Sequence, residues 1–117
     1  MNTERSKEEI KKHRHGLLPD AERYRVVRCR LDSDFTAGTS LLVLTVSHMD
    51  TGAVRKLRFY NVVLDEPMLV ALKDANGLYL LDTKHLGWAE SQRIEVGDWD
   101  GGPPLFWAEG VEQTQEE

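Results

Sequence analysis

Four histidines and one cysteine are the residues of this chain best suited to metal binding or nucleophilic chemistry. His13 and His15 have the spacing of a metal-binding pair, but three basic residues flank them, and nearby cations disfavour a divalent ion. No cluster of cysteines or carboxylates completes a set of four ligands. His48 is expected at the end of a strand and His85 in a loop. The sequence therefore predicts no metal site and no cofactor.

Cys29 could act as a nucleophile only if a base such as His48 approached it across a pair of strands. Its position between Arg28 and Arg30 in an alternating segment predicts a buried, inert thiol instead. The chain has no Gly-x-Ser-x-Gly motif, phosphate-binding loop or dinucleotide fingerprint. These observations favour a non-enzymatic protein, and an enzyme or small-ligand pocket between sheets is kept as an alternative.

The segment Asp98-Trp99-Asp100-Gly101 places carboxylates at alternate positions, as at the start of a calcium-binding loop. The similarity ends at the next residues. Gly102 stands where a polar ligand is needed, and Pro103 stands where the loop needs its turn glycine. We therefore expect a solvated turn.

All three tryptophans fall within one stretch of twenty residues near the C-terminus. Trp88 and Trp107 are expected in the core of the last strands. Trp99 stands between two aspartates at a loop tip, where an exposed aromatic ringed by carboxylates is suited to a basic or amphipathic protein partner. Alternatively, Trp99 folds back over the Gly-Pro turn and covers the core. The predicted partner-binding residues are Trp99, Asp98, Asp100 and Glu95.

A group of arginines on two predicted strands is the second candidate surface. If these strands pair, their guanidinium groups could line one sheet face, with Tyr24 or Tyr60 available for stacking, as a groove for single-stranded nucleic acid requires. The overall pI of about 5.4 works against phosphate binding, so this surface ranks second. Its residues are Arg23, Arg25, Arg28, Arg30, Arg55 and Arg58.

Alternation of apolar and polar residues predicts most of the elements that must position these side chains. Val27, Cys29 and Leu31 alternate with arginines, whereas Tyr24 and Val26 have the opposite phase, which predicts a β-bulge near residues 26–27. Strands are also expected at residues 41–47, 54–64, 78–81, 93–96 and 105–108. A tight turn is expected at residues 49–52.

Residues 65–77 are compatible with two local structures. Asp65 and Pro67 form a good helix start, and Asn76-Gly77 forms a good helix stop. Met68 and Leu72 then fall on one helical face. The alternative is a β-hairpin with a type I′ turn at Asn76-Gly77. We favour the helix.

Short strands separated by turns predict an all-β fold, mainly an antiparallel sandwich or partly open barrel, with at most one short helix and a flexible N-terminal arm. Residues 1–22 form the flexible charged arm, 23–112 the single β-rich domain, and 113–117 an acidic tail. The N-terminus lacks the apolar stretch of a secretory signal, and no apolar run is long enough to span a bilayer. We expect a cytoplasmic protein without a membrane partner.

Charge is distributed unevenly along the chain. Residues 1–60 contain twelve Lys and Arg against eight Asp and Glu, whereas residues 61–117 contain three against twelve. The hypothesis from the sequence is a non-enzymatic domain that binds a protein partner through its acidic, tryptophan-containing C-terminal half. An inhibitor that neutralises a basic toxin is one example. Homodimerisation through edge strands or the tryptophan-bearing strands stays open.

Overall fold

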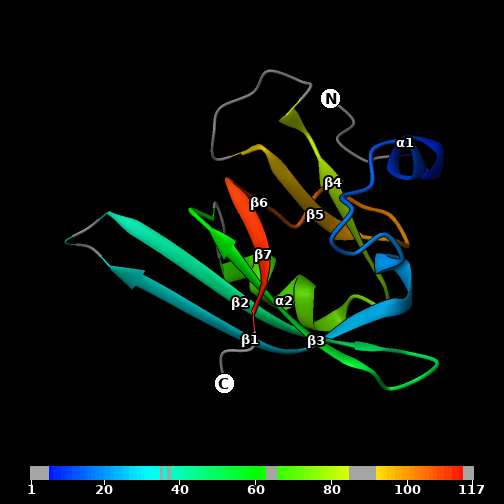
Figure 1. Ribbon diagram of the computed structural model, residues 1–117, viewed down its shortest axis with the longest axis horizontal. Coiled ribbons are helices and arrows are strands. Elements are labelled where there is room, and N and C mark those ends of the chain that lie inside the picture. The colour runs from blue at the N-terminus through cyan, green and yellow to red at the C-terminus, as the bar shows by residue number, and fades with distance from the viewer. Residues whose placement is uncertain (1–5, 35, 37, 63–65, 85–91, 115–117) are drawn as a thin grey trace.

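The computed structural model describes residues 6–34, 36, 38–62, 66–84 and 92–114. Seven strands form two antiparallel sheets, one of four strands and one of three (Figure 1). The prediction of a mainly antiparallel all-β fold is confirmed. Trp88 and His85, for which a core position and a loop position were predicted, lie outside the described residues.

The larger sheet has the strand order β1-β2-β3-β7. Its strands are β1 (Tyr24–Asp34), β2 (Thr39–His48), β3 (Val54–Tyr60) and β7 (Gly110–Thr114). The predicted turn between β2 and β3 is present. Gly52 adopts a φ of 74° there, which a side chain would disfavour, and the His48 ring accepts a hydrogen bond from the Asp50 N–H.

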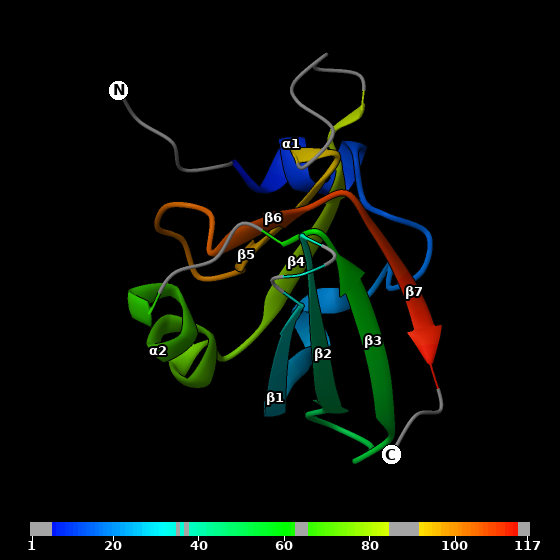
Figure 2. The same ribbon diagram turned by 90° about the vertical axis from the view of Figure 1, so that its left-hand side faces the viewer.

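The smaller sheet contains β4 (Leu78–Asp82), β5 (Ile94–Asp98) and β6 (Phe106–Ala108) in that order. The chain leaves β6 and runs directly into β7, so one continuous segment belongs to both sheets (Figure 2). The rings of Phe59 on β3 and Phe106 on β6 meet edge to face, with centroids 5.1 Å apart. Both rings are fully buried, and the core therefore lies between the two sheets.

The predicted β-bulge is confirmed, because the register of β1 against β2 shifts between Val26 and Arg28. The extra residue reverses the alternation of β1. Tyr24 and Val26, which precede it, therefore face the core on the same side as Cys29 and Leu31, which follow it. Beyond the bulge the core covers this face only partly, and Leu31 remains 45% exposed.

The helix α2 (Glu66–Asp74) confirms the helical interpretation of this segment. Leu72 and Ala75 are buried in the core, and Met68 and Leu69 pack against its edge. The chain then passes through Gly77 into β4. A Cβ at Gly77 would lie 2.7 Å from the Glu22 carbonyl oxygen, so the close approach of two backbone segments requires glycine here.

Residues 6–23 include α1 (Lys7–Lys12) and a 3₁₀ turn, η1 (Ala21–Arg23). The Ser6 hydroxyl accepts a hydrogen bond from the Glu9 N–H and so caps the start of α1. The segment pairs with β4 through two bonds, from the His15 N–H to the Leu80 carbonyl and from the Asp82 N–H to the His13 carbonyl. The flexibility expected for residues 1–22 stays a prediction, and in the structure residues 6–22 lie on the three-stranded sheet.

In the described part of the chain, no helix has both the length and the apolar character needed to cross a membrane.

Candidate functional site

Trp99 lies at the end of β5 and is half-buried. Its ring packs against a small second core formed by Ile10, Tyr79 and Leu81. Two cations lie over the same ring, with the Lys7 ammonium 5.0 Å and the Arg14 guanidinium 5.6 Å from its centroid. The interpretation of Trp99 as an exposed side chain is therefore wrong. As in the alternative, the ring folds back onto apolar residues, and these belong to the second core beneath α1.

Asp98 is the last residue of β5, and Asp100 lies in the turn that follows. The Asp98 carboxylate accepts a hydrogen bond from the Asp100 N–H, and the Asp98 carbonyl accepts one from the Gly101 N–H. This local bonding fixes the turn, as Asp does in many loops. Asp100 is exposed and Asp98 is half-buried, so both are accessible to a partner.

Glu95 does not belong to that surface, because it is fully buried. Its two carboxylate oxygens accept hydrogen bonds from the Tyr79 hydroxyl, at 3.0 Å, and from the Trp107 indole N–H, at 3.1 Å. Buried carboxylates are stable only with such donors. Glu95 therefore ties β4, β5 and β6 together, and the prediction that it contacts a partner is corrected.

Trp107 and Phe106 occupy opposite faces of β6, as alternation requires, but their roles are reversed from those expected. Phe106 is fully buried between the sheets, whereas Trp107 is half-exposed on the outer face. The expectation that Trp107 fills the core is therefore wrong. Its indole N–H is bonded to Glu95, and only part of the ring is exposed.

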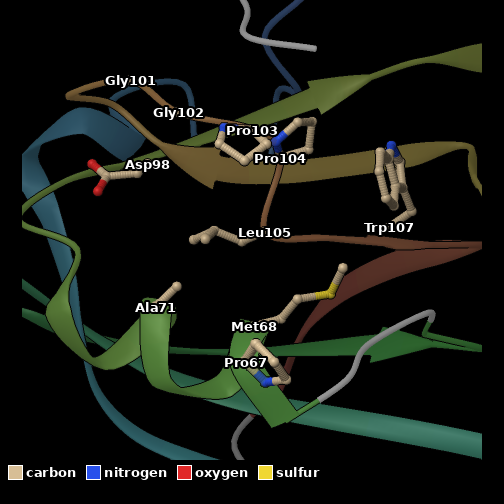
Figure 3. A pocket seen from close by; sticks show the side chains of 10 residues that line it. All are labelled: Pro67, Met68, Ala71, Asp98, Gly101, Gly102, Pro103, Pro104, Leu105 and Trp107. Atoms are coloured by element: carbon tan, nitrogen blue, oxygen red, sulfur yellow. The ribbon is translucent and has the colours of Figure 1, made fainter. Parts of the chain in front are cut away.

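A groove of about 510 Å³ lies between α2 and the loop that joins β5 to β6 (Figure 3). Positive φ angles at Gly101 (116°) and Gly102 (96°) let this loop turn away from the sheet before Pro103 and Pro104. Asp98 is the only ionisable side chain among the lining residues. We call this site the α2–loop groove, and its lining residues are Pro67, Met68, Ala71, Asp98, Gly101, Gly102, Pro103, Pro104, Leu105 and Trp107.

The sequence did not single out the residues of α2 that line this groove. Met68 and Ala71 belong to an ordinary amphipathic helix, and the helix-to-loop contact joins segments about thirty residues apart. A signal was present in the run Gly101-Gly102-Pro103-Pro104. Such a run cannot continue a strand, so it must form a loop of fixed shape beside the apolar residues that follow.

Four predicted arginines lie together on the outer face of the four-stranded sheet. The bulge brings Arg25 onto the same face as Arg28 and Arg30 of β1, and Arg58 of β3 lies two strands away in the row of Arg30. Lys56 shares this face. The Arg58 guanidinium forms an ion pair with Glu112 of β7, with 3.2 Å between Nη1 and Oε1.

The other members of the arginine group lie elsewhere. Arg55 points to the opposite side of the sheet and donates to the Leu17 carbonyl, and Arg23 pairs with Asp50 near the β2–β3 turn. The two tyrosines also do not form the expected stacking platform. Tyr24 is buried against His48, and the Tyr60 hydroxyl is bonded to Glu112. Nucleic-acid binding by this face stays a prediction.

The histidines and the cysteine are dispersed. His15 and His48 each accept local backbone N–H bonds, and His13 ends α1. Cys29 is exposed, not buried as expected, because the core does not extend under this part of β1. It pairs with Leu44, four residues along β2 from His48. Among the described residues, no group of three or more His, Cys, Asp or Glu is arranged to hold a metal ion.

Comparison with known protein families, curated proteins and solved structures finds no match for this chain.

Proposed function

We propose that this chain is a non-enzymatic domain that binds a protein partner through the α2–loop groove. The observation that carries the proposal is an open apolar groove with one carboxylate at its end. Met68, Pro103 and Trp107 offer apolar surface that an inserted side chain would remove from water, at about 25 cal/mol per Å². Half-exposed Trp and Met side chains are enriched at such contact sites.

The charge of the groove indicates the chemistry of the partner. Asp98 lines the groove and Asp100 lies exposed beside it. Their turn is held by its own hydrogen bonds, so little conformational entropy is lost when a cation binds there. A partner that inserts a large apolar side chain and places a Lys or Arg next to it would satisfy both features.

The same lining argues against catalysis. Enzyme sites bring together several polar or titratable groups around the reacting atoms. The α2–loop groove has a single ionisable side chain, and proline, glycine and apolar residues make up the rest. This composition suits the recognition of a projecting side chain.

A library of short linear peptides displayed on phage and selected against the immobilised domain tests the proposal. We expect enriched peptides to combine a large apolar residue with an adjacent Lys or Arg. Ala71→Arg fills the groove and adds a positive charge, so it should weaken a selected synthetic peptide more than about tenfold. Val70→Arg is the matched control, because Val70 is 60% exposed on the same helix and does not line the groove.

Asp98→Asn isolates the charge, since Asn keeps an oxygen that can accept the Asp100 N–H. We expect it to weaken the same peptide by about three- to tenfold, with the loss reduced at high salt. Selection of peptides without this pattern, or peptide affinities unchanged by Ala71→Arg, would show that the groove is not the binding site.

A further inference from the structure

A second groove lies on the other side of α2, along β1. Within the described residues β1 is an edge strand, because β2 is its only strand neighbour in the order β1-β2-β3-β7. It is eleven residues long, and Val27 (52%) and Leu31 (45%) are exposed. A long edge strand with exposed apolar residues is a template for pairing with another strand.

The helix α2 lies beside this edge of the sheet (Figure 2). A groove of about 320 Å³ separates the two elements. Its walls are largely apolar, with Lys73 at the helix side. We call it the β1–α2 groove, and its lining residues are Val26, Val27, Arg28, Cys29, Leu69, Leu72 and Lys73.

An edge strand beside a helix is suited to strand addition. In this mode an extended peptide pairs its backbone with the edge, and its side chains alternate between the two faces of the sheet. Here one set of side chains would enter the β1–α2 groove against Leu69 and Leu72. The other set would lie on the outer face, next to the side chains of β1.

Charge determines which segment fits. The outer face of β1 carries three exposed arginines, Arg25, Arg28 and Arg30, followed by one exposed carboxylate, Asp32. Opposite charges in neighbouring strands stabilise pairing, whereas like charges oppose it. A strand that carries Asp or Glu at alternate positions would therefore be attracted to these arginines.

We propose that β1 and the β1–α2 groove bind an extended segment of a partner protein as an added strand, with apolar residues facing the groove and Asp or Glu facing the arginines. This site is separate from the α2–loop groove, which is lined by other residues of the helix. Binding at the β1–α2 groove can therefore be tested independently of binding at the α2–loop groove.

A synthetic peptide of about ten residues that alternates Val or Leu with Glu is the probe. We expect it to bind the full chain and to protect β1 amides from hydrogen exchange. Two N-methylated versions, each methylated at alternate residues, test the backbone pairing, because only N–H groups that face β1 are needed. One version should lose more than about tenfold in affinity, and the other should keep most of it.

Two variants test the side chains. Val27→Lys places a charge at the groove and on the edge, and should weaken the peptide about tenfold. Arg28→Glu with Arg30→Glu should weaken it similarly and should gain affinity for a matched peptide with Lys in place of Glu. Lys56→Glu on β3 is the control for charge on the same face, and Ala71→Arg is the control for the α2–loop groove.

Three results would overturn the proposal. The first is a peptide that fails to bind, or whose affinity is unchanged by both methylation patterns. The second is a dimer in sedimentation experiments that Val27→Lys dissociates, which would assign the edge to a second copy. The third is single-stranded oligothymidylate that binds more tightly than the peptide and loses affinity equally when Lys56 or Arg28 is replaced. This result would assign the outer face to nucleic-acid binding.

Discussion

The hydrogen-bonded group around Glu95 depends on the absence of a side chain at Gly97. Gly97 is the cross-strand partner of Tyr79, and the tyrosine ring lies directly over it on the way to the Glu95 carboxylate. A Cβ built at Gly97 would lie 2.3 Å from ring atoms of Tyr79. The ring would have to move, and its hydroxyl would leave the buried carboxylate with one donor fewer.

Gly97→Ala should therefore lower the free energy of unfolding by about 1–3 kcal/mol, the usual cost of forcing extra atoms into a packed site. Urea denaturation followed by circular dichroism measures the change. Gly16→Ala is the matched control, since no atom lies within 4 Å of its Cβ position, and it should shift stability by less than about 0.5 kcal/mol. Equal effects of the two substitutions would contradict the role assigned to Gly97.

Individual side chains show where prediction from the sequence succeeds and where it stops. The phases of Val26 and Cys29 identified the bulge, because alternation is a local property of a strand. The burial of Glu95 and the cover over Trp99 depend on contacts with β4, β6 and α1. No local pattern encodes such contacts, so a carboxylate next to an acidic turn was mistaken for a surface group.

At the scale of elements, the segment from α1 to η1 acts as a cover for the three-stranded sheet. Ile10 is buried against Tyr79 and Leu81, and backbone bonds join His13 and His15 to β4. The Nδ1 atom of His15 accepts the Leu17 N–H at 3.1 Å, which requires this atom to be unprotonated. Burial lowers the pKa of His15, opposed in part by the nearby Asp82 carboxylate.

The attachment of this segment should therefore depend on pH. A pKa lowered by folding means that the neutral ring stabilises the folded state above the usual histidine pKa, and that this contribution is lost as pH falls through the lowered value. We expect the His15 and Leu17 amides to exchange with solvent more than about threefold faster at pH 5 than at pH 7.5, after correction for intrinsic rates.

His15→Asn provides the control for this effect. The Asn side-chain oxygen can accept the Leu17 N–H in the same turn and does not titrate. Its corrected exchange rates should be the same at both pH values. A pH effect that persists in His15→Asn would show that another group controls the attachment of the segment.

The strands and the helix α2 were easier to predict from the sequence than the position of the segment from α1 to η1. Strands, the tight turn at Gly52 and the helix α2 follow from periodicity and turn residues. The segment around α1 is short and mostly polar, with Ile10 as its single large apolar residue, so its own pattern carries little information. Contacts with the apolar outer face of β4 hold this segment in place. Because β4 is buried on both faces, its sequence does not alternate and does not show that this outer face needs a cover.

At the scale of the whole molecule, the two sheets share one core. Phe59 and Phe106 meet edge to face between them, and the run from β6 to β7 belongs to both. The main apolar layer of each sheet is buried against the other sheet, so separating the sheets would expose both layers to water. We therefore expect the domain to unfold as a single unit.

Phe106→Ala should lower the free energy of unfolding by about 3–5 kcal/mol, as for other large core side chains. Transitions monitored by circular dichroism and by tryptophan fluorescence should shift together. Val70→Ala, on the exposed side of α2, should change stability by less than about 0.5 kcal/mol. Separate transitions by the two probes would contradict a shared core.

The bulge in β1 also affects how this strand must be aligned with the strands of other proteins. With a period of two, one extra residue exchanges the assignment of every position on one side of it. Val27 has no pairing partner on β2, and this extra residue places Arg25 on the same face as Arg28 and Arg30. Two chains aligned without a gap at this residue would therefore match inward positions of one with outward positions of the other, and the basic face would seem to vanish from the comparison.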